Sequence, residues 1–597
     1  MSACALLAVA GSGACTPVTP ATPLRAAIRS QPLPRSAKPL RGLRYELRYR
    51  VPPGSGSPVL QVDLFLKGDP NGQTAIFLPG RWAFVRDFSQ WVRDVRVLTP
   101  GATIRLGPRP HYRLVVHPPG AKLHLRYEVV ARAPVPALGQ KNRYYHVFRR
   151  PGFRFVGHAV FAIPGWRALG RRYVELRWVT PPGSAWALAN SFGAGQAVQR
   201  LRASLFELRH AIYLGGDYRV ARRTVRGRPV VVAIRGRWKF TDRDLVALVS
   251  KTVGLQRAFW RDDRFPHFLV AVVPLPGRCC AYGGLGFTNS VALFLNTDKA
   301  IGPELTWLVV HELFHAWLGD RIRPAHLDQR HRWFFEGVTE YLAHLLILRH
   351  FNRSLPAYVA ELNQKIRHYW RSGQRTASLP RVLSGLWGNP DLYRLAYWRG
   401  HLLASNWHAA HQRATRGREG LGGLLRRLYA HLRRRGKQFT VSMLSTQTRR
   451  EHPGWIRRTV KQHITDGRLL RPDPRGLGPC VSLVNHTVHV FDLGFDWSAT
   501  KRRRRLSGVR HGGPAHKAGL RTNEKVWGWK LRTNDPDFAV QLYVRRQGRL
   551  RWVRYFPRQG PGWTVPQYRV DSKRLKRSPA ACLSWFGVPP ATPPPNR

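Results

Sequence analysis

Acidic residues are scarce in this chain of 597 residues, which has 32 Asp and Glu against 99 Lys and Arg and a formal net charge of +67. A basic excess attracts polyanions, nucleic acid first among them. The arginines, however, are spread over the whole chain, and no helix-turn-helix, RNA-recognition or zinc-finger pattern accompanies them. A coding bias or an unusual environment explains so diffuse an excess equally well. The charge therefore does not indicate a nucleic-acid partner, although its field would favour acidic substrates or an anionic envelope surface.

Long apolar runs are also missing, because no segment holds the roughly 18 uninterrupted apolar residues of a membrane-spanning helix. The first residues, MSACALLAVAGSGACTPVTPATPL, resemble the end of a secretory signal, with Cys15 at a lipobox-like position. A basic n-region is absent, so a misassigned start codon and a disordered leader are open alternatives. We expect export to the bacterial cell envelope or periplasm, with a signal or a lipid anchor on Cys15, and a cytoplasmic location if the leader is not a signal.

Cysteines are few, six in all, and two of them fall in the leader. The other four are Cys279, Cys280, Cys480 and Cys582. Adjacent cysteines are poorly placed to bridge each other, because a disulfide has narrow geometric limits. A bond from Cys279 or Cys280 to Cys480 or Cys582 is an option that the sequence does not decide.

The hydrophobic pattern changes along the chain. Short runs from about 41 to 240, such as LRYELRYRV and KLHLRYEVVA, alternate apolar and polar residues between turn signals such as DPNG, which indicates a β-sandwich. From Asp242 the period is helical, with a strand pair at FLVAVVPL and VALFLNT, and β patterning returns after about 466. The predicted fold class is multidomain α+β, divided as leader and linker 1–40, N-terminal β domain 41–240, mixed domain with a helical bundle 241–466 and C-terminal β domain 467–597.

The segment TWLVVHELFHAWLGD carries the clearest chemistry, since it contains H-E-x-x-H within an apolar helical stretch. The i, i+4 spacing places His311 and His315 on one helix face, one turn apart, where both imidazoles can bind one metal ion. Glu312 is then close enough to act as general base on a metal-bound water. Two solvated histidines on an amphipathic helix are the ordinary alternative, but the apolar flanks do not suit it.

A catalytic zinc usually has three protein ligands and an open fourth position. No third histidine follows at the metzincin spacing, but a second apolar segment, WFFEGVTEYLAHLL, supplies Glu336 as the third ligand. Glu340 lies one helical turn further along the same face. It is placed either to accept the second ring N–H of a ligating histidine or to be an ordinary helix carboxylate. We expect one Zn²⁺ per chain.

HELFHAWLGDRIRP followed by WFFEGVTEYL resembles the glycyl aminopeptidase family of zinc metallopeptidases, a branch of the thermolysin-like (gluzincin) clan. The matching residues are His311, Glu312, His315, Trp317, Arg321, Ile322, Arg323, Pro324, Trp333, Glu336, Gly337 and Thr339. The resemblance implies an N-terminal β domain, a thermolysin-like catalytic domain and a C-terminal PDZ domain.

The run GVRHGGPAHKAGLRTNEKVWGW, preceded by Leu493-Gly494-Phe495, is similar to part of a PDZ domain, with a solvated basic loop ahead of it. Little room remains between Trp529 and Val540 for a second PDZ helix, so a docking module is favoured over peptide capture.

The same resemblance implies a tyrosine that donates a hydrogen bond to the oxyanion of the tetrahedral intermediate. Tyr397, in Tyr-Trp-Arg-Gly, matches the family's Y-x-K-G with Arg for Lys; Tyr393 is the reserve, and a core aromatic is the alternative for either. The family's G-G-L-E-H strand aligns the substrate, and its Glu holds the substrate's amine. The corresponding substrate-binding residues are Gly283, Gly284, Leu285 and Gly286.

Gly286 and Phe287 replace the family's Glu and His, so recognition of a free N-terminus is in doubt. In that interpretation Phe287 could present an apolar surface to a substrate side chain. The sequence therefore predicts a zinc metallopeptidase that acts on peptides or proteins, with aminopeptidase-like ancestry. The alternative is a zinc-binding pseudoenzyme or a PDZ-type peptide-binding scaffold of the cell envelope.

Overall fold

The computed structural model describes residues 42–587, apart from 55, 84, 132–142, 167–169, 182, 276–281, 325–328, 437, 534 and 547. The predictions for the leader with Cys15, and for Cys279 and Cys280, lie outside these residues. The chain forms two compact units, Met1–Ile347 with Glu419–Val460 and Leu348–Arg418 with Lys461–Arg597. Each unit is considered separately. Among the described residues, no helix has the length and hydropathy needed to cross a membrane.

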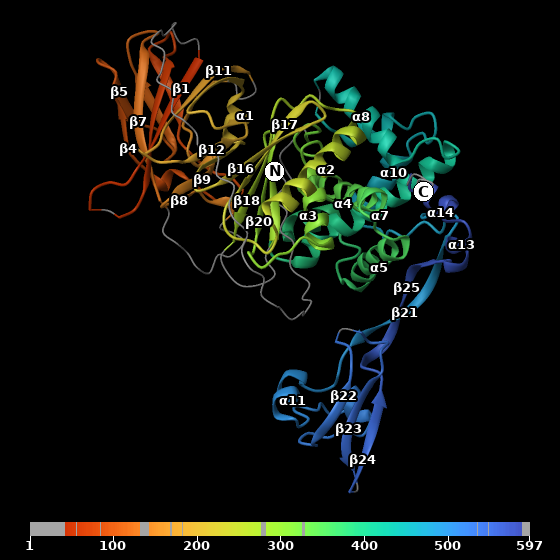
Figure 1. Ribbon diagram of the computed structural model, residues 1–597. Helices are drawn as coiled ribbons and strands as arrows, with labels where there is room; N and C mark the ends of the chain where they lie inside the picture. Colours follow the sequence, from red (N-terminus) through yellow and green to blue (C-terminus); the bar gives the residue numbers. More distant parts are fainter. Residues whose placement is uncertain are drawn as a thin grey trace, which may run out of the picture. The chain divides into compact units, whose positions relative to one another are not determined.

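The N-terminal half of the first unit is built of β-sheets (Figure 1). The six-stranded sheet has the order β14-β11-β1-β2-β7-β4, with β1 Gly42–Arg50, β2 Val59–Lys67, β4 Val92–Val97, β7 Lys122–Val130, β11 Arg172–Val179 and β14 Val198–Ala203. A four-stranded sheet, β10-β3-β6-β5, contains β3 Gln73–Phe77, β5 Thr103–Leu106, β6 Tyr112–Val116 and β10 Ile163–Pro164. A five-stranded sheet, β13-β12-β15-β9-β8, contains β8 Val147–Arg149, β9 Gly152–Val156, β12 Ala187–Asn190, β13 Gly193–Ala194 and β15 Ile212–Gly216.

The alternation seen in the sequence places one face of the alternating strands, among them β1, β7 and β11, in the core. In β1, Leu43, Tyr45 and Leu47 are buried while the residues between them are less so. This is the period-2 pattern of a strand with one packed face. One hydrophobic cluster then continues from these strands into the next sheet, as far as Phe294.

A mixed sheet follows in the order β16-β17-β18-β20-β19. Its strands are β16 Arg219–Val225, β17 Arg228–Ile234, β18 Phe268–Pro274, β19 Tyr282–Phe287 and β20 Ser290–Leu295. The parallel strands β17, β18 and β20 are nearly continuous apolar runs, as expected for strands buried on both faces. β19 turns back antiparallel to β20 and forms one edge of the sheet.

Two helices of the first unit pack on this sheet and on each other, α2 Asp242–Trp260 and α3 Pro303–Phe314 (Figure 1). The other helical segments are η1 Ser89–Trp91, η3 Gly157–Ala159, α1 Leu205–Arg209, η4 Gln329–His331, α4 Arg332–His350, α8 Leu421–Arg435, α9 Val441–Thr446 and α10 Trp455–Val460. In α8 the leucines are buried, whereas Arg433, Arg434 and Arg435 are exposed. α8 is therefore an amphipathic helix with a basic outer face.

The second unit combines helices with a long β-ribbon. Its helices are α5 Leu355–Arg371, α6 Leu379–Gly385, α7 Pro390–Ala414, η5 Lys461–Thr465, α11 Trp497–Arg503, α12 Pro514–Lys517, α13 Ser572–Arg577 and α14 Pro579–Ser584. β21 Val481–Phe491 pairs with β25 Arg558–Val570, and β22 Val526–Lys530, β23 Val540–Arg546 and β24 Arg549–Tyr555 form a three-stranded sheet. The multidomain α+β class is confirmed.

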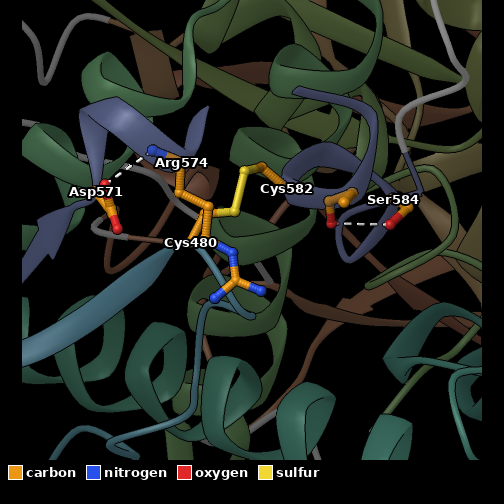
Figure 2. Close-up of a disulfide and its surroundings, with 6 residues drawn as sticks. Cys480, Asp571, Arg574, Cys582 and Ser584 are labelled. Atoms are coloured by element: carbon orange, nitrogen blue, oxygen red, sulfur yellow. Dashed lines mark hydrogen bonds between the residues drawn. A yellow bond between two sulfur atoms is a disulfide. The ribbon is translucent and has the colours of Figure 1, made fainter. Parts of the chain in front are cut away.

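A disulfide joins Cys480 to Cys582 (Figure 2), two buried residues whose Cα atoms are 5.3 Å apart and which are separated by 102 positions. The bond pairs the two C-terminal cysteines with each other, so the option of a bond from Cys279 or Cys280 to either of them is wrong. β21 begins directly after Cys480, and α14 contains Cys582. The bridge therefore fixes the base of the β-ribbon.

The C-terminal segment has its own small core, formed by Leu493, Leu506, Leu520 and the inward side chains of β22 and β23. The predicted basic loop Lys501–Arg505 is partly helical, because α11 extends to Arg503, although its side chains are exposed. The GGPAHKAGL run forms a turn followed by α12, as its pattern predicts. Among the described residues between Trp529 and Val540 no helix is present.

Candidate metal centre and active site

The H-E-x-x-H segment forms the end of α3. Pro303 occupies the first turn, where a missing N–H costs no hydrogen bond. His311 and Glu312 are 0 % and 1 % exposed, and Leu308, Val309 and Leu313 beside them are fully buried. α3 ends at Phe314, and His315 follows as its C-cap with helical dihedral angles, φ −63° and ψ −15°. The two imidazoles therefore keep helical spacing, although the helix ends earlier than the apolar pattern predicts.

Helix α4 brings a carboxylate to these two histidines. Oε2 of Glu336 lies 3.6 Å from Nε2 of His311 and 3.7 Å from Nε2 of His315. The ligand atoms of all three side chains lie within 4.8 Å of one another. Zinc bonds of about 2.0–2.2 Å in a tetrahedron place ligand atoms about 3.3–3.6 Å apart. The distances from Glu336 to the two imidazoles are thus close to the spacing that a single zinc ion requires.

Both histidines are oriented by contacts to their other ring nitrogen. Nδ1 of His315 lies 2.9 Å from the carbonyl oxygen of Leu318, which can only accept, so Nδ1 carries the proton. Nδ1 of His311 lies 3.0 Å from Oε2 of Glu340. Nε2 of each ring is then left as the electron-pair donor that faces Glu336. Glu340 also contacts His344, whose Nε2 is 3.2 Å from its other oxygen.

Glu336 is held ionised within this buried cluster. Burial alone would raise the pKa of Glu336, but the guanidinium of Arg332 and the contacts with His311 and His315 outweigh it and lower the pKa well below its usual range. Nη2 of Arg332 lies 3.6 Å from Oε1 of Glu336, one helical turn away on α4. A charged carboxylate is the form that binds a metal ion.

Glu312 has the opposite environment. Burial raises the pKa of Glu312, partly offset by His311 and His315. Neither carboxylate oxygen makes a hydrogen bond to any described residue. Nε2 of His315 likewise has no hydrogen-bond partner there. Buried polar atoms are rarely left without partners. The unpartnered oxygens of Glu312 and Nε2 of His315 therefore fit a site that holds a metal ion with a water molecule beside it.

The edge strand β19 lies directly beside Glu312. A Cβ atom on Gly284 would overlap Cγ and Cδ of Glu312, so only glycine lets the strand approach the carboxylate this closely. Gly283, Gly284 and Leu285 are buried and Gly286 is half-buried. The candidate substrate-binding residues therefore form a strand edge next to the candidate base.

Phe287 does not present its ring to a substrate. It is 1 % exposed, and its ring packs 6.1 Å from Trp82 and 5.7 Å from His210, centroid to centroid. The interpretation of Phe287 as an apolar surface for a side chain is wrong, because the hydrophobic cluster of the β-sheets takes up its ring. At Gly286 an added Cβ would lie 3.4 Å from Cβ of His315, so a side chain at this position would extend beside the second histidine.

Tyr397 and Tyr393 both belong to α7 in the second unit. Tyr397 is 6 % exposed, with its ring 6.0 Å from that of Tyr393. Arg399, which replaces the family's lysine, donates hydrogen bonds to the carbonyl oxygens of Ala377 and Arg375 at 2.7 and 2.8 Å. This arginine therefore holds the loop before α6. The oxyanion role of Tyr397 stays a prediction.

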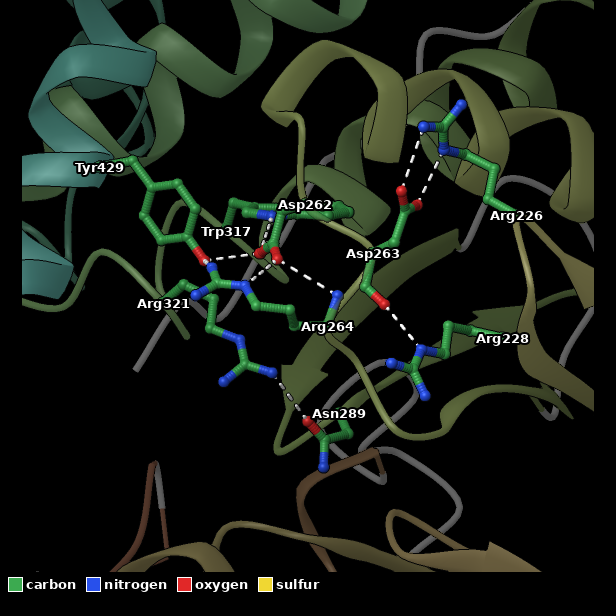
Figure 3. A network of polar contacts seen from close by, with 9 residues as sticks. All are labelled: Arg226, Arg228, Asp262, Asp263, Arg264, Asn289, Trp317, Arg321 and Tyr429. Carbon is green, nitrogen blue, oxygen red and sulfur yellow. Dashed lines mark hydrogen bonds and ion pairs between the residues drawn. The ribbon is translucent and has the colours of Figure 1, made fainter.

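Two groups near the site were not predicted from the sequence. Arg143 is 1 % exposed, its Nε and Nη1 make no hydrogen bond to described residues, and its charge lowers the pKa of Glu312 against the stronger effect of burial. Asp262 accepts hydrogen bonds from Trp317 at 3.2 Å, Arg264 at 2.7 Å and Tyr429 at 2.5 Å (Figure 3). No local pattern marks Arg143 among 99 basic residues. Asp262 follows α2, far in sequence from Trp317 and Tyr429.

A buried helix that carries H-E-x-x-H, with a glutamate from the next helix, defines the gluzincin class of zinc metallopeptidase. Residues 304–391 match the model of the M61 glycyl aminopeptidase family, which places the catalytic segment in that family. The match includes both histidines, Glu312, Glu336 and Glu340. The predicted resemblance to a family of zinc metallopeptidases is confirmed over this segment.

A solved structure shares the fold of this chain. An aminopeptidase N family protein from Idiomarina loihiensis is 15% identical, covers 92% of this chain and 100% of its own length, and has a TM-score of 0.65. An M1 zinc metallopeptidase from Deinococcus radiodurans is 15% identical over 73% of this chain and 97% of its own, with a TM-score of 0.47. Among curated proteins, none matches significantly.

Proposed function

We propose that this protein hydrolyses peptide bonds with one zinc ion held by His311, His315 and Glu336. The observation that carries the proposal is the buried convergence of these ligand atoms beside the unpartnered carboxylate of Glu312. When bound, zinc supplies Lewis acidity to the scissile carbonyl and lowers the pKa of a water ligand. Glu340 orients His311 through Nδ1, and the Leu318 carbonyl orients His315.

Glu312 acts as the general base. Burial raises the pKa of its carboxyl, which strengthens it as a base and lets it pass the proton on to the leaving amine. The charges of His311, His315 and Arg143 oppose this rise in the pKa of Glu312. The oxyanion role of Tyr397 stays in the proposal as what the resemblance implies, because a phenol donates without first being ionised.

The edge of β19 aligns the substrate. An extended peptide can add its backbone to an open strand edge, and the glycines of β19 let it come close to Glu312. Because Gly286 replaces a carboxylate, the site gives no charge partner at this position to a substrate's ammonium group. We expect weak activity on simple aminoacyl reporters and better cleavage of N-blocked or internal peptide bonds.

The specificity part is tested by restoring the carboxylate. Gly286→Glu should raise kcat/KM for peptides with a free N-terminus by about 10-fold relative to their N-acetylated forms, because it adds an ion-pair partner. Gly286→Gln is the matched control and should leave the ratio unchanged. Wild-type protein that rapidly releases N-terminal glycine and ignores N-acetylated peptides would contradict this part alone.

The central proposal is tested by elemental analysis together with a peptide-library cleavage assay on the purified protein. We expect one zinc per chain and metal-dependent cleavage that a chelator abolishes and added zinc restores. Absence of stoichiometric metal would exclude the proposal. Stoichiometric zinc without cleavage of any library peptide would favour the alternative, a zinc-binding scaffold.

For the C-terminal segment we retain the PDZ-like interpretation as a proposal. It rests on the Leu-Gly-Phe turn at 493–495 and on the GGPAHKAGL turn and helix. α11, not a strand, follows this turn, so no open strand edge is available there for peptide addition. A docking module therefore fits better than a peptide-binding groove.

Export to a bacterial envelope or periplasm is likewise proposed. The bond between Cys480 and Cys582 supports an oxidising compartment, since structural disulfides are rare in the cytosol. Fractionation of the native host would test this location, with the protein recovered from the envelope or periplasm and not from the cytosol.

A further inference from the structure

The three-stranded sheet of the second unit has two very different faces. One face contributes Val540, Leu542 and Val544 to the small C-terminal core, where they are fully buried. Because strand residues alternate between faces, Gln541, Tyr543 and Arg545 lie on the opposite face. We call that second face of β22–β24 the aromatic–basic face (Figure 1 shows its strands).

Aromatic rings form the centre of this face. Tyr543 is paired across the ladder with Trp552, and their ring centroids are 5.0 Å apart with an interplanar angle of 31°. A Cβ on Gly528 would lie 3.6 Å from Trp552, so this indole lies across the neighbouring strand. Trp527, at the bulge in β22, adds a third ring. The two indoles are 46% (Trp527) and 49% (Trp552) exposed, a large apolar area for a protein surface.

Cations surround the rings and carboxylates are absent from the strands. β22 has one lysine, β23 two arginines and β24 three arginines, and none of the three has an Asp or Glu. Lys530, Arg545 and Arg554 are exposed on the aromatic–basic face and make no ion pair with any described residue. Unpaired cations on an exposed surface indicate an anionic partner.

The packing of the rings favours lipid over nucleic acid. Nζ of Lys525 lies 4.2 Å from the centroid of the Trp527 ring, and Tyr543 packs against Trp552 with its ring tilted by 31°. These neighbours cover ring faces on which a base would have to stack. Both tryptophans are nevertheless about half exposed. Tryptophan and tyrosine favour the headgroup layer of a bilayer, where lysine and arginine meet lipid phosphates.

We propose that the aromatic–basic face of β22–β24 binds an anionic phospholipid surface. The indoles of Trp527 and Trp552 enter the headgroup layer while Lys530, Arg545 and Arg554 pair with phosphates. This interaction is independent of the zinc site, and it brings the protein to a membrane surface.

Vesicle co-sedimentation of the full chain tests the proposal. Phosphatidylcholine vesicles that contain phosphatidylglycerol should bind the protein, and vesicles of phosphatidylcholine alone should bind it weakly. The triple variant Lys530→Glu, Arg545→Glu, Arg554→Glu should bind about 100-fold more weakly, since each cation contributes near the surface. The variant Trp527→Ala should lose about 10-fold while every charge remains.

The matched control reverses three exposed arginines at the end of α8: Arg433→Glu, Arg434→Glu and Arg435→Glu. It changes the net charge equally and should keep vesicle affinity within about 2-fold. Thermal unfolding of every variant should match that of wild type and shows that each folds. Equal losses in both triple variants would overturn the proposal in favour of diffuse charge. Unchanged binding by Trp527→Ala would also overturn it, as would tighter, face-dependent binding of a single-stranded oligonucleotide than of vesicles.

Discussion

Contact between the Gly284 backbone and the Glu312 carboxylate sets the position of the candidate base. A methyl group at residue 284 would occupy the space of Cγ and Cδ of Glu312. Gly284→Ala should therefore displace the carboxylate and lower kcat by about 100-fold, because a displacement of about 1 Å is enough for such a loss. Zinc content should stay at one per chain, since no predicted ligand changes.

Gly286→Ala on the same strand provides the comparison. Its added Cβ would contact Cβ of His315 at 3.4 Å, which small shifts accommodate. Steady-state kinetics with an internally quenched peptide should show a change of less than about 5-fold. Equal losses in the two alanine variants would mean that strand flexibility, and not the space beside Glu312, sets the rate.

Removing the base itself gives a larger effect. Glu312→Gln keeps the shape of the side chain and removes its capacity to accept a proton, so kcat should fall by about 10³-fold or more. Elemental analysis should still find zinc. Glu304→Gln on the same helix, where the carboxylate is exposed and pairs with Lys299, should keep normal activity. Near-normal turnover by Glu312→Gln would exclude this mechanism.

At the residue scale, the sequence predicts those site residues whose relation is local. His311, Glu312 and His315 belong to one helical repeat, so spacing alone places them. Glu336 required only the assumption that the next helix packs against the first. Arg143 belongs to a different part of the chain, and its closeness to Glu312 depends on how the β-sheets pack against α3, which no local pattern encodes.

Among the elements, a buried carboxylate connects three helical segments. Asp262 lies directly after α2 and accepts hydrogen bonds from Trp317, which follows α3, and from Tyr429 of α8 (Figure 3). Removing its charge should loosen the turn that holds His315 in place. Asp262→Asn should lower the free energy of unfolding by about 1–3 kcal/mol.

The effect of Asp262 should depend on pH. Burial would raise its pKa, but the hydrogen bonds from Arg264 and Tyr429 outweigh it and bring the pKa from 3.8 to about 2. Since the folded state lowers this pKa, the ionised group stabilises the fold fully above about pH 4 and loses this effect as the pH falls towards 2. Denaturant unfolding of wild type and Asp262→Asn should therefore converge at low pH.

Asp263→Asn is the control at the neighbouring position. Asp263 pairs with Arg226, but both side chains are more than a third exposed. An exposed ion pair contributes about 0–1 kcal/mol, so this variant should change stability little. A larger loss in Asp263→Asn than in Asp262→Asn would contradict the role given to the buried carboxylate.

Helices and strands could be predicted from the sequence where one side of the element is buried, because burial of one side produces a regular spacing of apolar residues. The alternating strands of the N-terminal sheets and the helix α8 follow their patterns, since one side of each is packed. The sequence did not predict the helix α11, because its charged residues give no apolar stripe. It also did not predict the burial of Phe287, which depends on the neighbouring sheets. Both depend on contacts between segments distant in sequence.

At the scale of the molecule, the disulfide closes a loop of 102 positions. A crosslink of this span restricts the unfolded chain strongly, so Cys582→Ser should lower the stability of the second unit by about 2–5 kcal/mol. Thermal unfolding should show a lower Tm for this unit under non-reducing conditions. Cys480→Ser and the double variant should give the same decrease, because either change removes the one bond.

Division of the chain at this scale is the part least accessible from sequence. The helical pattern runs without a break to about residue 466, yet residues 348–418 and 419–460 belong to different compact units. Helical periodicity is the same on both sides of these limits. The long-range contacts of α8–α10 assign residues 419–460 to the first unit. Helical periodicity carries no information on such contacts.

The bond between Cys480 and Cys582 also determines what a protease would leave behind. Arg502, Arg503, Arg504 and Arg505 are exposed and lie between the two bridged cysteines. A tryptic nick at any of them would produce two fragments that remain covalently attached. Electrophoresis would then show one full-length band without reductant and two shorter bands with it.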